Sequence, residues 1–431
     1  MNLFLRIAAA LALVVALAAP RASAAEAVNP SLQKEVESYL AETPPATGGD
    51  TTAKAFFKNG LQFETADKSF TAHLGGRLEF DQAYFGSDGD YGGAQKQDSW
   101  YFRELFTVVE GTIYTNGFFR VELDFASGAV GLKDCFLALK NLGPAGTFQA
   151  GSYKVITCLS DQTSLRFVTF MERPACVNAF AYSYQDGFSL FNNFLEGNML
   201  YGGVEAFKVS ANGTATDNGG YGFATRWAVA FLEDKDKNQI LQLGINFVYS
   251  TTPGGTIQYR ARPNIGTGAR LVDTGTFAAH EASTFDFELL FTWEKLHVQA
   301  EFFWVDVSGN AGPEPTFTGF YVEVGYWLIG GNNNYNKGAK KLDRPKVTEM
   351  FHAGSGKGRG AWQVAIQFDN VDLSDGAVVG GEQDCITFGV RWFWNPQMCW
   401  KFNIIWADIS NGGPFGEGNM TVFGTRFQVD F

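Results

Sequence analysis

A two-residue period in hydrophobicity from about Phe63 to the last residue constrains this chain more than any other feature. The pattern is clearest at the C-terminus. One face of the last stretch carries Phe423, Thr425, Phe427, Val429 and Phe431, and the other carries Val422, Gly424, Arg426, Gln428 and Asp430. Since side chains alternate between the two faces of a β-strand, this pattern predicts a strand with one apolar and one polar face.

Sixteen such stretches recur along the chain. They predict strands near residues 70–85, 100–114, 118–126, 132–140, 146–153, 187–194, 199–206, 221–232, 239–250, 284–295, 297–307, 318–329, 361–371, 384–394, 398–409 and 420–431. Strands in soluble sheets average about five or six residues, whereas a tilted strand that crosses a bilayer needs about nine to eleven. The lengths therefore favour a membrane protein.

The distribution of residue types across the two faces decides which kind. The expected outward positions are Phe, Trp, Val, Ile and Leu, and the expected inward positions are Arg, Glu, Asp, Gln, Gly and Thr. With 41 Phe, 15 Tyr and 10 Trp, the chain can cover a wide outer surface with apolar groups. Lipid cannot hydrogen-bond to backbone groups, so only a closed barrel satisfies every strand edge. We expect an all-β fold, a transmembrane antiparallel β-barrel of about 16 strands with a water-filled interior.

The lengths of the connections suggest an orientation. With both termini in the periplasm, short turns should alternate with longer extracellular loops. Residues 86–99, 154–186, 251–283, 372–383 and 410–419 are the predicted long loops. The long basic segment 331–359 breaks the rule, because it falls where a short periplasmic turn is expected. We expect a solvated loop there, with anion capture at the periplasmic mouth as the alternative.

The N-terminus predicts export from the cytoplasm. Arg6, the apolar run 7–19 and the small residues Ala22-Ser23-Ala24 form a signal peptide over residues 1–24, cleaved near Ala24. Residues 25–59 are expected to be a periplasmic extension with a short helix at 29–42 and a linker. The barrel then occupies residues 60–431.

Charge and motifs exclude several functions. The formal charge is −12, and about −14 after signal removal, which argues against nucleic-acid binding. The five cysteines and four histidines show no metal-site spacing and no catalytic motif, so we expect no enzyme activity, cofactor or metal. Export permits disulfides. A Cys158–Cys176 bridge and separate thiols both remain open.

Short motifs in a consistent order resemble the phosphate-selective porins of the O and P type. They include Leu74-Gly75-Gly76-Arg77-Leu78, Glu110-Gly111-Thr112, Phe170-Met171-Glu172-Arg173 and Trp392-Phe393-Trp394-Asn395-Pro396. The resemblance implies a homotrimeric sixteen-stranded porin whose third extracellular loop, here 154–186, folds inward. The terminal strand ending in Phe431 resembles the assembly signal of outer-membrane barrels, so we expect it to bind the barrel-assembly machinery, with outer-membrane lipid around the barrel.

The candidate pore residues follow from the strands and from this loop. They are Arg77, Arg103, Arg120, Lys154, Arg166, Glu172 and Arg173. The alternative is that the arginines only pair with neighbouring carboxylates. The formal charge of loop 154–186 is zero, which favours a passive porin for small hydrophilic solutes more strongly than a filter for anions such as phosphate. A structural barrel or surface adhesin with a blocked lumen is the alternative function.

Overall fold

The computed structural model describes residues 52–89, 91, 97–209, 220–234, 237–309, 312–352, 354 and 358–431, all within one compact unit, Thr52–Phe431. The predicted signal peptide and the predicted helix at 29–42 lie outside the described residues. Among the described residues, no helix is long and apolar enough to cross a membrane.

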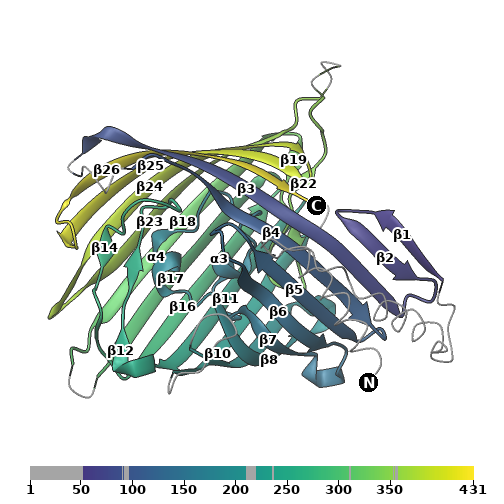
Figure 1. Cartoon of the computed structure of the whole chain (residues 1–431), viewed down its shortest axis with the longest axis horizontal. Coiled ribbons are helices and arrows are strands. Elements are labelled where there is room, and N and C mark those ends of the chain that lie inside the picture. Colours follow the sequence, from purple (N-terminus) through teal and green to yellow (C-terminus); the bar gives the residue numbers. More distant parts are fainter. Residues whose placement is uncertain are drawn as a thin grey trace, which may run out of the picture. The chain divides into compact units, whose positions relative to one another are not determined.

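Sixteen antiparallel strands form a closed barrel, as predicted, and β26 pairs with β3 to close it (Figure 1). The strands are β3 (Phe70–Gly89), β4 (Ser99–Ile113), β5 (Gly117–Asp124), β6 (Gly131–Leu139), β7 (Thr147–Lys154), β8 (Tyr184–Phe194), β9 (Leu200–Lys208), β10 (Tyr221–Asp234), β11 (Gln239–Thr251), β16 (Glu281–Trp293), β17 (Leu296–Ser308), β18 (Thr316–Ile329), β23 (Ala361–Asp375), β24 (Val378–Asn395), β25 (Met398–Gly412) and β26 (Gly418–Asp430).

The outer face is apolar, as the alternation predicts. Phe188, Ile366 and Trp406, for example, are exposed on it, whereas polar neighbours such as Gln367 point inward and are buried. The inner face differs from the prediction in one region. Near the end of the barrel opposite Phe431, many inward positions of β17 to β26 are apolar, because they pack against segments inside the barrel.

Two further strands precede the barrel and were not predicted. β1 (Ala53–Phe57) and β2 (Leu61–Thr65) form a hairpin, and β2 pairs with the first residues of β3. β26 pairs with β3 only from Arg77 onward. On the same edge of β3, the preceding residues Thr71 to Leu74 pair with β2 instead. The predicted boundary at residue 60 therefore falls inside this hairpin.

We call the barrel end where β3 begins and β26 finishes the terminal end, and the opposite end the loop end. Short turns at the terminal end alternate with mostly longer connections at the loop end, as predicted. The prediction of a long loop at 372–383 is wrong. The ladder between β23 and β24 continues to the pair Asp375–Val378, and Gly376 takes a positive φ of 57° in the tight turn.

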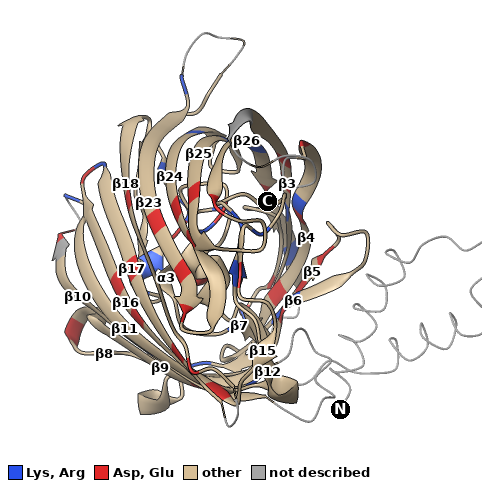
Figure 2. Cartoon of the chain, turned by 90° about the vertical axis from the view of Figure 1, so that its left-hand side faces the viewer, with Lys and Arg blue, Asp and Glu red and all other residues tan. Residues whose placement is uncertain are grey.

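Three connections fold into the barrel. Residues 155–183 enter from the loop end and carry α3 (Leu159–Gln162) and α4 (Ala175–Phe180), which lie inside the ring of strands (Figures 1 and 2). Residues 252–280 enter from the same end with β12 (Thr256–Ile257), β13 (Arg260–Ala261), β14 (Val272–Asp273) and β15 (Phe277–Ala278). The third connection, 330–360, starts at the terminal end and carries β19 (Gly331–Asn332), β20 (Tyr335–Asn336), β21 (Lys341–Leu342) and β22 (Lys346–Val347).

We call residues 331–347 the terminal insert. Its backbone carbonyls at Ala339 and Lys340 accept hydrogen bonds from Arg226 of β10, and Lys341 Nζ donates to the carbonyl of Gln162 at 2.5 Å. Lys340 is fully buried. The expectation of a solvated loop is therefore wrong for this part, because Lys340 and Lys341 donate to backbone carbonyl groups inside the barrel.

Candidate functional site

The main candidate site is a cavity of about 660 Å³ inside the barrel, which we call the basic cavity. The wall from β3 to β8 forms one side of it, and loop 155–183 and the terminal insert form the other. Eight basic and four acidic side chains line it: Arg77, Arg103, Arg120, Lys133, Lys154, Arg166, Arg173 and Lys341, against Glu104, Glu122, Asp134 and Asp343. The lining therefore carries a net positive charge.

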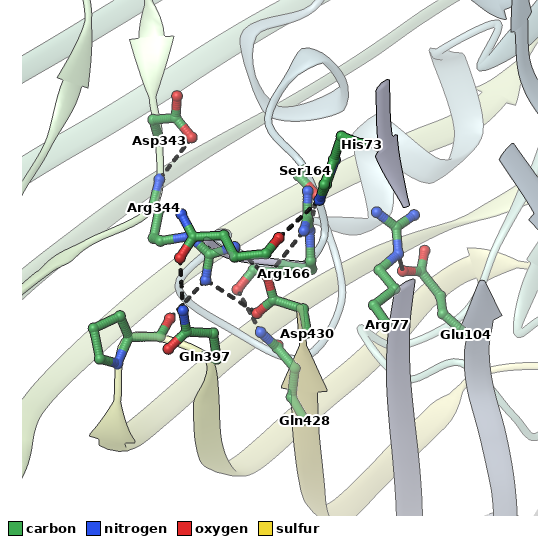
Figure 3. Close-up of polar contacts among 12 residues, drawn as sticks. His73, Arg77, Glu104, Ser164, Arg166, Asp343, Arg344, Gln397, Gln428 and Asp430 are labelled. Carbon is green, nitrogen blue, oxygen red and sulfur yellow. Dashed lines mark hydrogen bonds and ion pairs between the residues drawn. The ribbon is translucent and has the colours of Figure 1, made fainter. Parts of the chain in front are cut away.

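Arg77 and Arg120 come from the barrel wall. Arg77 Nε lies 2.5 Å from Glu104, which Figure 3 shows on the neighbouring strand, and Arg120 lies 2.6 Å from Glu110 and 2.7 Å from Glu122. Both arginines thus pair with wall carboxylates, as the structural alternative expected. They line the cavity as well.

Arg103 reaches the lumen because of a β-bulge. The β3–β4 register shifts between Glu79 and Phe80, which leaves Arg103 as the extra residue of β4. Arg103 and Glu104 then both face inward, although they are consecutive. A bulge re-aims a side chain in this way without ending the strand.

Glu172 of loop 155–183 holds Arg103 in place. Two hydrogen bonds, of 2.6 and 2.9 Å, join the Arg103 guanidinium to the two carboxylate oxygens of Glu172, which also accepts from Arg426. Burial by itself would raise the pKa of Glu172, but the two arginines lower it to about 2. Glu172 therefore stays ionised at neutral pH.

The other loop candidates pair with groups behind the cavity surface. Lys154 Nζ lies 3.1 Å from the Asp161 carboxylate, and Arg173 donates to the carbonyls of Ser160, Asp161 and Thr163. Asp161 is buried and does not line the cavity. A charge count along loop 155–183 therefore gives zero, although its exposed lining is basic.

Arg166 and the terminal insert both contact the same residue of the last strand, β26. Asp430 of β26 accepts from Arg166 Nη1 at 3.0 Å and also pairs with Arg344 of the insert (Figure 3). This contact joins loop 155–183, the insert and the closing strand. Asp430 is 1% exposed, so its charge is hidden behind the two arginines.

Two further cavities lie beside the basic cavity. One of about 450 Å³ is lined by Arg103, Glu172, Arg262 and Arg270, among others. Another of about 490 Å³ lies against the β1–β2 hairpin, between Lys58, His73 and Glu110. Arg103 belongs to the lining of both the first and the basic cavity, and Phe118 to that of the basic and the third. The three cavities thus adjoin along the β3–β5 wall.

Sequence reasoning missed several lining cations. Arg262 and Arg270 lie in loop 252–280, and Lys341 lies in the terminal insert. Burial and then the charge of Lys154 lower the pKa of Lys341 to about 8. The basic composition of 331–359 was a usable signal, but it pointed to the mouth and not to the interior.

The cysteines form no bridge. Cys158 and Cys176 are both free thiols, so the disulfide left open by the sequence is absent. Cys158 precedes α3, Cys176 lies in α4, and both are buried.

Comparison with known proteins identifies the family. Residues 73–431 match the family described as phosphate-selective porin O and P. An uncharacterised protein of Caulobacter vibrioides is 27% identical over 95% of this chain and 83% of its own length. Porin O of Pseudomonas aeruginosa is 24% identical over 91% of this chain and 95% of its own length.

Solved structures share the fold at low identity. The anion-selective porin of Comamonas acidovorans superposes with a TM-score of 0.55 at 10% identity, over 83% of this chain and 99% of that one. The trimer form of OmpT of Vibrio cholerae gives 0.53 at 11% identity, over 84% and 99%. The chain belongs to the phosphate-selective porin O and P family and is an outer-membrane porin, a channel for passive diffusion of small hydrophilic solutes.

Proposed function

We propose that this porin prefers anions and that phosphate-like oxyanions bind in the basic cavity. The observation that carries the proposal is the lining of eight basic against four acidic side chains. Guanidinium and ammonium groups suit such a solute, because they offer charge-assisted donors to several oxygens at once. The family, described as phosphate-selective, and the anion-selective porin that shares the fold support the same direction.

The candidate residues have two roles in this proposal. Each of the seven forms an ion pair or a carbonyl contact that fixes its position. Rigid placement adds to anion binding, since no side-chain ordering is needed when the solute arrives. Glu104 and Glu122 anchor Arg77 and Arg120 within the lining, whereas Asp161, Glu172 and Asp430 anchor the remaining cations from outside it.

The three adjoining cavities support a path through the barrel and oppose a blocked lumen. A solute entering at the loop end would meet Arg262 and Arg270, pass Arg103, cross the basic cavity and leave past Phe118. Apolar packing of the inserts against β17–β26 confines this path to the opposite wall. The width available to a solute is then set by the inserts.

The remaining expectations complete the proposal. The termini lie in the periplasm after cleavage near Ala24, three copies assemble, and Phe431 at the end of β26 binds the barrel-assembly machinery. The trimer form of OmpT, which shares the fold, supports the trimer. No catalytic role is proposed, because the family and the fold point to a channel.

The test is conductance of the purified protein in planar bilayers. Reversal potentials in a potassium chloride gradient should show anion preference, and added phosphate should block chloride current. Cation preference without phosphate block would refute the proposal. Absence of single-channel steps would support the blocked barrel instead.

A further inference from the structure

A second group of buried polar side chains lies away from the proposed solute path, where loop 155–183 begins. Cys158 is the residue before α3, and Asp286 and Glu301 face it from β16 and β17. One ligand atom from each of the three lies within 4.8 Å of the other two, and all three residues are buried. None of the three lines any of the cavities described above.

Negative charge in this region is balanced only in part by cations. Asp286, Glu288 and Glu301 are 3%, 3% and 2% exposed. Arg226 binds Glu288 with two hydrogen bonds, of 2.8 and 2.9 Å. Within the described residues, neither Asp286 nor Glu301 forms an ion pair with a basic side chain. Two carboxylates are therefore buried together without a partner of opposite charge, which is costly.

One oxygen of this group is without a hydrogen-bond donor. Asp286 Oδ2 accepts from Asn246 at 2.6 Å, whereas Asp286 Oδ1 is fully buried and accepts from no described residue. Glu301 is better satisfied, because it accepts from the backbone N–H groups of Leu159 and Ser160 and from the Tyr321 hydroxyl. Asp286 therefore has a buried oxygen free to bind a cation, within a group that also includes a thiol.

We propose that Cys158, Asp286 and Glu301 bind a divalent transition-metal ion of the zinc type. A thiolate with two carboxylates is a donor set that suits Zn²⁺, whereas Ca²⁺ and Mg²⁺ take oxygen ligands alone. Binding releases the Cys158 thiol proton to solvent, and three anionic ligands then surround the double positive charge. Asn246 and Tyr321 orient the two carboxylates from outside the ligand shell.

Cys158 has an unfavourable backbone conformation, which suits a residue whose side chain has a binding role. Its φ of 65° lies in the left-handed region, which is unfavourable for a residue with a Cβ atom. The bound ion would join the start of α3 to the wall strands β16 and β17. Gln162 and Ser164, a few residues further along, line the basic cavity. The ion would therefore fix the loop that forms one side of that cavity.

The test uses the full mature porin in detergent, stripped with a chelator and dialysed against Zn²⁺ alone. We expect one tight Zn²⁺ per chain, and at least tenfold weaker binding in Cys158→Ser and in Asp286→Asn. Cys176→Ser is the matched control, because Cys176 is another buried free thiol of the same loop outside the cluster. It should bind Zn²⁺ as the wild type does.

Spectroscopy of the unmutated protein keeps the test independent of any folding defect. Co²⁺ in place of Zn²⁺ should give a thiolate-to-metal charge-transfer band in the near ultraviolet that Zn²⁺ abolishes. Stoichiometric Zn²⁺ binding that Cys158→Ser leaves unchanged would overturn the proposal. Absence of both Zn²⁺ binding and the Co²⁺ band would also overturn it, and would mean that Asp286 and Glu301 share a proton.

Discussion

Arg103 is the side chain whose removal tests the proposed anion path most directly, because it lines both the basic cavity and the cavity next to it. The change Arg103→Gln reduces the basic lining from eight cations to seven. It also leaves Glu172 with Arg426 as its remaining arginine partner. Both effects make the junction between these two cavities less favourable for an anion.

The size of the effect follows from the charge and its surroundings. A unit charge about 4 Å from an ion contributes about 1 kcal/mol in bulk water and about 4 kcal/mol at an effective dielectric constant of 20. A hydrated cavity lies nearer the lower value, so we expect a loss of about 1–2 kcal/mol. Since about 1.4 kcal/mol is a factor of ten, the phosphate concentration that halves chloride current should rise about 5- to 30-fold.

The assay is titration of phosphate against single-channel chloride conductance in planar bilayers, with reversal potentials measured alongside. Arg103→Lys keeps the charge and should lose less than Arg103→Gln. Arg359→Gln is the control, because Arg359 is 72% exposed and lines none of the three cavities. A half-blocking concentration that stays at the wild-type value in Arg103→Gln would refute the reasoning.

Three other changes test the barrel and the lining. Arg426 is buried with Asp81, Glu79 and Glu172. The change Arg426→Gln should lower the free energy of unfolding by about 3–5 kcal/mol, because these carboxylates lose their cation. Urea titration in detergent measures this loss. Ile366 is 52% exposed on the outer face, so Ile366→Arg places a charge in contact with lipid. This change should make the free energy of folding into lipid vesicles less favourable by about 2–4 kcal/mol. A change near zero would contradict the outward orientation of Ile366. Lys341, with its pKa lowered to about 8, is mostly charged below pH 8 and neutral above it. Phosphate block should therefore weaken between pH 7 and 9, and Lys341→Gln should remove that part of the pH dependence.

The barrel was predictable because each strand carries its own evidence. Alternation in residues such as Phe423 and Arg426 depends only on the pleat and on the contrast between lipid and water. Sixteen strands and most turns followed from it. The tight turn at Gly376 did not, because a run rich in Ser, Asp and Gly resembles a loop even where the ladder continues through it.

The lining of the site was less predictable, because it depends on contacts between distant segments. Lys341 enters the basic cavity only because the terminal insert packs under loop 155–183 through Leu159 and Leu342. Arg103 faces inward only because of a bulge that no alternation pattern reveals. The net charge of the loop was counted correctly as zero. That count could not show that Asp161 is buried and does not line the basic cavity.

The last strand has a consequence for how such a channel is made. Arg426 and Asp430 of β26 hold the wall strand β3, loop 155–183 and the terminal insert. These anchors exist only after the C-terminal strand has closed the ring. The step that seals the wall therefore also adds ion pairs that hold both interior segments. Assembly of the barrel and positioning of these segments are thus coupled through two residues of one strand.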